Sequence, residues 1–319
     1  MGRYIIRRLL IAIPTLLVIS FVVYGILALA PGDPLSQFAT NPNVPPEVRE
    51  RIREQLGLNQ PWHIRYVKWL IALIKGDFGY SFMSHLPVIN LLIERLPNTL
   101  AVVGVAYVLG VALAVPIGMI SAVKRYSIFD HLATTFAFIG FSVPTFFTGL
   151  LLIIVFSINL HWFPFIYDST LKVRDFASLV DQMKQSIMPI IVLALFDTAT
   201  LARYIRAEML EHLPLDYVRT ARGKGIAERL VVVRHVLRNS LIPVVTLVAL
   251  GVPAVFAGAI VTEQIFRVPG IGELLIRSIN DSDTPVVAAI VFLFAVLVVL
   301  FNLIADVLYA VLDPRIRYA

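Results

Sequence analysis

Six long runs of apolar residues, separated by polar segments, dominate this chain of 319 residues. The runs lie near 9–30, 99–123, 132–158, 187–206, 241–262 and 286–309. A helix needs about 20 apolar residues to cross the hydrocarbon layer, and a chain in lipid must satisfy its backbone hydrogen bonds internally. The pattern therefore predicts an all-α, polytopic membrane protein with six transmembrane helices and a single transmembrane domain over 1–319.

The composition agrees with a membrane protein. Of the residues, 58% are hydrophobic and 15% are charged, whereas soluble domains have about 25% charged residues. Cysteine is absent, which excludes disulfides and thiolate metal sites. The first apolar run follows basic residues, as in a signal peptide, but it is longer than the usual apolar core of such peptides. We therefore expect an uncleaved first helix.

An even number of spans places both ends of the chain on one side of the membrane. Basic residues near the membrane concentrate on that side, and such a bias marks the cytoplasm. They are Arg3, Arg7, Arg8, Lys124, Arg125, the bases from Arg203 to Arg238, Arg315 and Arg317. Both termini are therefore predicted to be cytoplasmic.

The first external segment, 31–98, is too long to be a plain loop. Two prolines followed by EVRERIREQLGL predict a helix that begins near Pro46. The amphipathic stretch 66–74, which contains Trp69, predicts a second helix at the membrane interface. Apolar residues at helical spacing between 176 and 183 predict another helix, interfacial or docking, within a second external loop at 159–186.

The cytoplasmic loop at 207–240 has the most unusual polar pattern. From Asp216 onward the chain reads DYVRTARGKGIAERLVVVRHVLRNSLIP. Asp216 is predicted to cap a short helix at 217–222, which Gly223 and Gly225 would end. A second predicted helix, at 227–240, leads into the fifth span.

Two interpretations of this basic loop stay open. Its bases could serve as topology signals alone, or they could form a surface that docks onto an acidic partner protein or onto anionic lipid. Topology signals require neither the glycine pair nor the second helix. The pattern therefore favours a docking site for a separate motor protein.

Two acidic residues lie within or at the edge of the apolar runs. Asp197, inside the fourth span, could line a substrate path, cap a kink after Pro189, or bond with Thr198 or Thr200. Asp306, near the inner end of the sixth span, is expected to pair with a cytoplasmic base. Because intramembrane acids can relay protons, a proton-coupled secondary carrier is the alternative from another functional class.

The signatures of enzyme chemistry are missing. No phosphate-binding G-x-x-x-x-G-K-[ST] sequence occurs, and no two histidines stand four residues apart as zinc ligands. The segment 140–143 lacks the second glycine of a serine-hydrolase elbow. We therefore expect no catalytic, metal-binding or cofactor-binding residues, and any energy for transport must come from a partner.

Several motifs resemble those of the permease subunits of ABC importers for dipeptides, oligopeptides and nickel. In the peptide branch the cytoplasmic loop reads D-Y-x-R-T-A-R-A-K-G and then R-H-x-L-R-N-x-L-I-P, which this chain matches with Gly223 in place of alanine. The general form of that loop begins Glu-Ala-Ala, where this chain has Arg219-Thr220-Ala221. Further resemblances lie at 4–14, 31–34, 56–61, 76–81, 203–206 and 269–272.

The resemblance implies a type I ABC importer permease fold in a prokaryotic plasma (inner) membrane, and a transporter subunit that is not an enzyme. The implied partners are a second, homologous permease subunit, two cytoplasmic ATPases that bind ATP and Mg, an extracytoplasmic solute-binding protein and membrane lipid, without nucleic acid. The implied substrates are di- or oligopeptides, with nickel chelates and glutathione as alternatives.

In that family the loop forms coupling helices that sit in a groove of the ATPase. Residue by residue, the resemblance assigns ATPase coupling to Asp216, Tyr217, Arg219, Thr220, Ala221, Arg222, Gly223, Lys224, Gly225, His235, Leu237 and Asn239. It implies that ATP-driven closure of the ATPases moves this loop together with the inner ends of the fourth and fifth spans.

Overall fold

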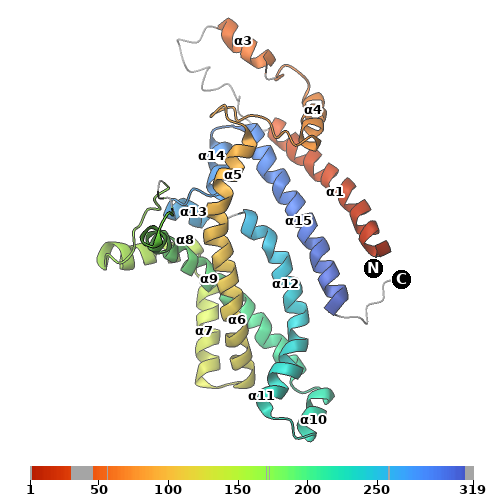
Figure 1. The fold of residues 1–319 in the computed structure, drawn as a ribbon, viewed down its shortest axis with the longest axis vertical. Coiled ribbons are helices and arrows are strands. Elements are labelled where there is room, and N and C mark those ends of the chain that lie inside the picture. Colours follow the sequence, from red (N-terminus) through yellow and green to blue (C-terminus); the bar gives the residue numbers. More distant parts are fainter. Residues whose placement is uncertain are drawn as a thin grey trace. The chain divides into compact units, whose positions relative to one another are not determined.

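The computed structural model describes residues 2–29, 46–55, 57–169, 171, 173–257 and 259–312 (Figure 1). Regular structure in these residues is helical, without β-strands, apart from one isolated bridge between Tyr80 and Pro87. The prediction of an all-α protein is confirmed. The predicted external segment before Pro46, and the basic residues Arg315 and Arg317, lie outside the described residues.

Five helices in the described part of the chain are long and apolar enough to cross a membrane. They are Leu10–Leu29, Val88–Val123, Phe176–His212, Glu228–Phe256 and Thr284–Leu308. The sixth candidate is a bent pair, Ile128–Gly140 with Thr145–Asn159. The break falls at Pro144, and Val143 before it is extended, with φ −87° and ψ 123°, because proline disfavours a helical residue ahead of it. The apolar run at 132–158 therefore forms two helices.

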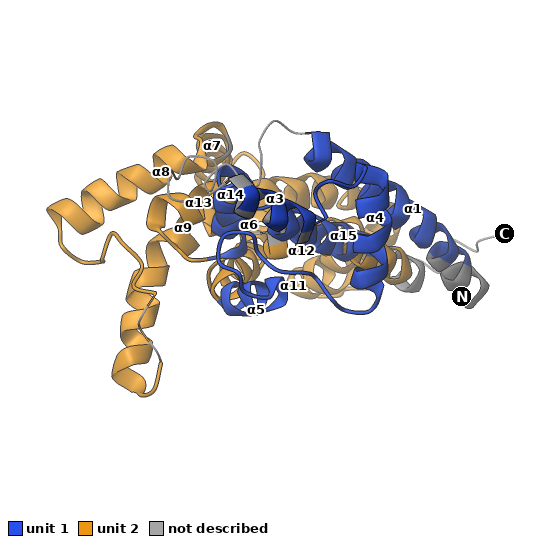
Figure 2. Cartoon of the chain, turned by 90° about the horizontal axis from the view of Figure 1, so that it is seen from above, with its two compact units in different colours: residues 1–97, 270–299 blue, residues 98–269, 300–319 orange. Residues whose placement is uncertain are grey.

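The chain divides into two compact units, which Figure 2 colours separately. Unit 1 comprises 1–97 and 270–299, and unit 2 comprises 98–269 and 300–319. Two of the long helices, those at 88–123 and 284–312, contribute residues to both. The single permease domain over 1–319 stays a prediction.

Unit 1 contains helices where the sequence predicts them, near Pro46 and at 66–74, so both helices are confirmed, and their place outside the membrane stays a prediction. Its helices are α1 (Gly2–Leu29), α3 (Pro46–Gln55), α4 (Trp62–Ile74), α14 (Ile271–Asn280) and the first parts of α5 (Val88–Thr99) and α15 (Thr284–Leu312).

Aromatic side chains fix α4 against α1. The rings of Phe21 and Tyr66 meet edge to face, with centroids 5.3 Å apart, and those of Tyr24 and Trp69 lie 5.4 Å apart. The hydroxyls of Ser20 and Tyr66 share a hydrogen bond of 2.9 Å. Such aromatic pairs add about 0.5–1.5 kcal/mol beyond the area they bury. The predicted interfacial helix is therefore held on the first span by its own aromatic face.

Two polar contacts tie distant segments of unit 1 together. The buried Asp283 carboxylate accepts hydrogen bonds from Ser81 Oγ at 2.5 Å and from the Phe82 backbone N–H at 3.0 Å. Arg95 of α5 forms an ion pair with Glu273 of α14 at 2.9 Å. The first contact fixes the loop before α5 to the beginning of α15, and the second fixes α5 to α14.

Unit 2 holds the remaining helices. In order they are the π-helical turn η1 (Leu100–Gly104), α6 (Val105–Val123), α7 (Ile128–Ser142), α8 (Thr145–Leu152), η2 (Ile153–Asn159), α9 (Phe176–His212), α10 (Asp216–Gly223), α11 (Glu228–Leu230), η3 (Val231–Leu237), α12 (Arg238–Ala257) and α13 (Ile260–Phe266). The end of α5 and the last part of α15 also belong to this unit.

Helix α9 is longer than the fourth apolar run at both ends. The helix predicted between 176 and 183 is its first part, not a separate interfacial helix. A capping box starts α9: the Asp175 carboxylate accepts from the Ser178 backbone N–H at 2.8 Å, and Ser178 Oγ accepts from the Asp175 backbone N–H at 3.0 Å. This pair satisfies two backbone donors that a helix otherwise leaves unpaired.

The fifth span also differs from its prediction. α11, η3 and α12 follow one another without interruption, so the second helix of the basic loop runs directly into the span, as the sequence predicts. The span ends at Ala257, however, and Ala259 leaves helical geometry, with φ −95° and ψ 78°. The predicted end at 262 is therefore wrong, because a separate helix, α13, begins at Ile260.

Small residues let α6 and α9 approach closely. An added Cβ at Gly110 would lie 2.7 Å from Asp197 Cβ, and one at Gly118 would lie 2.7 Å from the carbonyl oxygen of Ala202. Ala114, between the two glycines, is fully buried. The pair forms the centre of unit 2.

Replacing Gly118 by alanine is expected to lower the free energy of unfolding by about 1–3 kcal/mol, since overpacking forces neighbours to move. The new Cβ would also lie 2.8 Å from Ile205 Cβ. Gly104→Ala is the matched control, because its Cβ would meet Val255 Cγ1 at an ordinary 3.6 Å. Thermal unfolding of the purified variants measures both effects. An equal loss in the two variants would contradict a packing requirement specific to Gly118.

Candidate functional site: the basic loop between α9 and α12

The loop between α9 and α12 forms a helical hairpin at one end of unit 2. α10 directs Val218 and Ala221 inward, where they join Val231, Val232 and Val236 in one buried cluster. Figure 1 shows α10 and α11 together at one end of the long helices α9 and α12, which they connect. The loop is therefore a packed element with an apolar core of its own.

The turn of the hairpin depends on Gly225. This residue has φ +75°, a left-handed conformation that favours glycine. Its N–H donates to the carbonyl oxygen of Arg222 at 2.9 Å, which helps to close the end of α10. Gly223 is the last residue of α10 and has no positive φ, so the two glycines predicted to end the helix are not equivalent.

One ion pair crosses this turn. Arg222 donates from Nε and Nη2 to the two carboxylate oxygens of Glu228, at 3.1 and 2.7 Å. The paired carboxylate raises the pKa of Arg222 above its ordinary value. Both side chains are exposed, so the pair contributes about 1 kcal/mol or less to stability. Its main effect is to fix the orientation of α10 relative to α11.

The beginning of α10 differs from the prediction. Asp216 is not the cap: Leu215 occupies that position, without a side-chain hydrogen bond, and Asp216 lies in the first helical turn. An acid there interacts favourably with the positive end of the helix dipole. Tyr217 Oη and His212 Nδ1 lie 3.0 Å apart and share a hydrogen bond, which ties α10 to the end of α9.

The residues assigned to ATPase coupling fall into three groups according to their exposure to solvent. Exposed ones are Asp216, Tyr217, Arg219, Thr220, Arg222, Gly223, Lys224 and Gly225, and half-buried ones are His235, Leu237 and Asn239. Ala221 is 5% exposed and lies in the core of the hairpin, where it supports the surface and cannot be part of it. Ala221 is buried because η3 packs against it, and the sequence of the loop does not reveal this packing.

Positive charge remains available on the hairpin. Lys224, Arg229, Arg234 and Arg238 are exposed, and none forms an ion pair with another described residue. Arg219 has only a long contact of 3.4 Å with Asp216, and both of these side chains are largely exposed. This surface suits an acidic or anionic partner.

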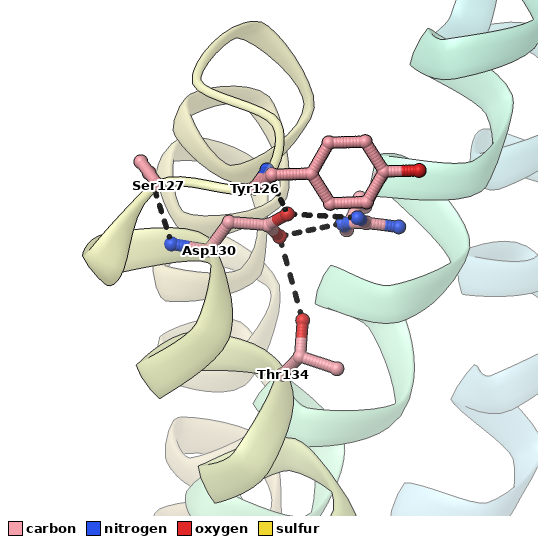
Figure 3. Close-up of polar contacts among 5 residues, drawn as sticks. Tyr126, Ser127, Asp130 and Thr134 are labelled. Atoms are coloured by element: carbon pink, nitrogen blue, oxygen red, sulfur yellow. Dashed lines mark hydrogen bonds and ion pairs between the residues drawn. The ribbon is translucent and has the colours of Figure 1, made fainter.

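A buried ion pair joins α9 to α7, near the end of α9 at which the loop begins. Arg206 donates to both carboxylate oxygens of Asp130, at 2.7 and 2.8 Å. Figure 3 shows Asp130 with Tyr126, Ser127 and Thr134 around it. The Tyr126 backbone N–H and the Thr134 hydroxyl also donate to this carboxylate, at 2.9 and 3.4 Å.

Sequence reasoning included Arg206 in a motif but missed its partner. Asp130 follows Ser127 by three residues, and Ser127 Oγ accepts from the Asp130 backbone N–H, so Ser127 caps α7. That spacing is a helix-start signal and gives no sign of a partner in α9. The pair fixes α7 to the end of α9 from which the loop departs.

Asp197 is half-buried on α9, next to Gly110 of α6. It forms no hydrogen bond or ion pair with any described residue. The alternative of a bond with Thr198 or Thr200 is wrong, because the Thr198 hydroxyl donates to the Gly110 carbonyl at 3.3 Å and that of Thr200 to the Phe196 carbonyl at 3.1 Å. A place for Asp197 on a substrate path stays a prediction.

The apolar spans define the class of this chain, which is a multi-pass helical membrane protein. The chain belongs to the family described as binding-protein-dependent transport system inner membrane component, which matches residues 114–318. The N-terminal model of the same kind of component matches residues 1–103.

Curated relatives match over the whole chain. The oligopeptide transport system permease protein AppB of Bacillus subtilis (strain 168) is 44% identical over 319 residues, covering 100% of both chains. The dipeptide transport system permease protein DppB of Escherichia coli (strain K12) is 36% identical, covering 100% of this chain and 99% of that protein. A putative peptide transport system permease protein of Brucella abortus (strain 2308) is 37% identical, with 100% of both covered.

These findings make the chain a multi-pass inner-membrane permease subunit of a binding-protein-dependent ABC importer, which works with other components and is not itself an enzyme. They do not favour the proton-coupled carrier.

Proposed function

We propose that this permease moves di- or oligopeptides into the cytoplasm. The observation that carries the proposal is 44% identity, over the full length of both chains, to a protein named as an oligopeptide permease. The names of the other two relatives described above also refer to peptides. Nickel chelates and glutathione are the alternative substrates within the same kind of transporter.

We further propose the composition of the transporter. A second, homologous permease subunit pairs with this one, two cytoplasmic ATPases bind ATP and Mg, and an extracytoplasmic binding protein delivers the substrate. The family description, which makes transport dependent on a binding protein, supports the last of these. Both termini lie in the cytoplasm, a placement supported by the concentration of basic residues around the hairpin and the turn after α6.

The basic hairpin is the proposed contact with the ATPase. Its exposed cations give it charge complementarity to an acidic groove, and its packed core lets it move as one body. η3 and α12 continue from the hairpin into the fifth span, so a displacement of the hairpin reaches the membrane without a flexible joint. Rigid-body movement of such elements is a common basis of switching between two states.

Transport by the reconstituted complex tests the substrate and the energy source together. Proteoliposomes with the two permeases, the ATPases and the binding protein are expected to accumulate a labelled peptide only when ATP is supplied. Unlabelled peptides are expected to compete, whereas nickel chelates and glutathione are not. Uptake driven by a pH gradient without ATP, or competition by a nickel chelate alone, would contradict the proposal.

A further inference from the structure

Unit 1 contains a cavity of about 840 Å³ that the transport mechanism above does not use. Its walls come from the end of α1, one side of α4, the turns at 57–60 and 77–82, and the start of α15. Ligand sites in proteins commonly have volumes of about 300–1,000 Å³. The cavity is therefore large enough for a small polar group with part of an attached chain.

Three polar atoms at this cavity are buried without a hydrogen-bond partner among the described residues. They are Arg65 Nε, Trp69 Nε1 and Gln60 Oε1, and all three residues line the cavity. Buried polar groups are nearly always paired, so each exception indicates a missing partner such as a ligand, ion or water. The first two atoms are donors and the third is an acceptor.

The charge of the cavity points to an anion. Arg53, Arg65 and Lys68 line it, whereas Asp77 is its only acidic lining residue among those described. One oxygen of Asp77 already accepts from the Gly79 backbone N–H at 2.9 Å. A ligand that places an anionic oxygen near Arg65 and Trp69, and a hydroxyl near Gln60, would satisfy all three unpaired atoms.

The surroundings of the cavity favour a lipid over a soluble anion. The same helix α4 exposes an apolar stripe at Ile64, Val67, Ile71 and Ile74, with exposed fractions of 41, 52, 50 and 77%. Such a stripe beside basic residues is typical of a helix in the membrane interface. The aromatic residues Tyr24 and Trp69 line the cavity, and aromatic rings favour the same depth.

We propose that this cavity binds the headgroup of an anionic phospholipid that carries a hydroxyl, with phosphatidylglycerol chemistry. Arg65 and Trp69 donate to the phosphate, Lys68 adds positive charge, and Gln60 accepts from the headgroup hydroxyl. The acyl chains then lie along the exposed apolar residues of α4 and α1. Basic pockets beside membrane helices recognise anionic headgroups by the same electrostatic attraction.

Native mass spectrometry of the intact transporter, extracted from bilayers of phosphatidylglycerol and phosphatidylethanolamine, tests the proposal. The unchanged complex is expected to retain phosphatidylglycerol preferentially, and Arg65→Ala with Lys68→Ala to retain about tenfold less, because charge-assisted hydrogen bonds are lost. Arg174→Ala with Lys184→Ala is the matched control, since it removes two exposed cations from outside the cavity.

A second variant guards against a folding defect. Trp69→Phe keeps an aromatic ring against Tyr24 but removes the indole N–H, and is expected to reduce retention severalfold in a complex that still assembles. Equal retention by the cavity and control variants would overturn the proposal, as would equal retention of phosphatidylethanolamine. Displacement of the lipid by millimolar inorganic phosphate would overturn the lipid assignment. The lipid assignment would also be overturned if Arg65→Ala with Lys68→Ala lowered the affinity for the binding protein while lipid retention stayed unchanged.

Discussion

Replacing Arg206 by alanine is expected to destabilise the permease by about 3 kcal/mol. The change leaves Asp130, whose side chain is 3% exposed, without its countercharge, and breaking a buried ion pair in this way commonly costs about 3–5 kcal/mol. The lower end applies because the Arg206 side chain is 26% exposed. Thermal unfolding in detergent, followed by the loss of helical circular dichroism, measures the effect.

An exposed ion pair provides the control for Arg206. Lys184 and Asp181 lie 3.6 Å apart with side chains 54 and 60% exposed, so Lys184→Ala is expected to change stability by less than about 1 kcal/mol. Replacing Arg206 together with Asp130 by apolar residues is expected to recover much of the lost stability, since no buried charge then remains unpaired. Equal melting temperatures for Arg206→Ala and Lys184→Ala would contradict a structural role for the buried pair.

Replacing Gly225 by valine is expected to reduce co-purification of the ATPases at least about tenfold. At φ +75° a residue with a side chain is strained, by about 1–2 kcal/mol for the left-handed conformation, and a β-branched residue tolerates it least. The turn would rearrange, and α10 would lose its orientation relative to α11. Affinity purification of the complex, with the ATPases quantified against this chain, gives the result.

Gly223 supplies a matched control for Gly225. It lies two residues earlier, has no positive φ, and an added Cβ would meet no atom within 4 Å, as at Gly225. Gly223→Val is therefore expected to retain the ATPases, and both variants should insert into the membrane normally. If both variants lose the ATPases equally, side-chain bulk on the surface, and not the turn, is responsible.

The helical hairpin shows how far local sequence predicts this site. Its two helices and the glycine turn follow from residues near one another in the chain, because capping, φ preference and helix periodicity are local properties. The burial of Ala221 does not follow, since it depends on the approach of Val231 and Val236 from the next helix. The sequence therefore predicts the shape of the hairpin better than the face it offers a partner.

The apolar runs alone determined that this protein is helical and crosses a membrane, because span length is set by the thickness of the hydrocarbon. Motifs along the chain indicated its family, and the family match confirmed it. Tertiary structure decided the rest. Asp130 and Arg206 are 76 positions apart, and Ser81 and Asp283 are 202 apart, so no local pattern could pair them.

The cavity in unit 1 likewise arises only from tertiary packing. Its unpaired donors and acceptor lie on α4 and the turn before it, yet the cavity that these residues line also needs α1, the loop at 77–82 and the start of α15. Periodicity places a side chain on one face of its own helix and says nothing about what covers that face. The sequence by itself determined the membrane helices and the basic hairpin, whereas folding alone decided which charged groups were buried, paired or left open to a ligand.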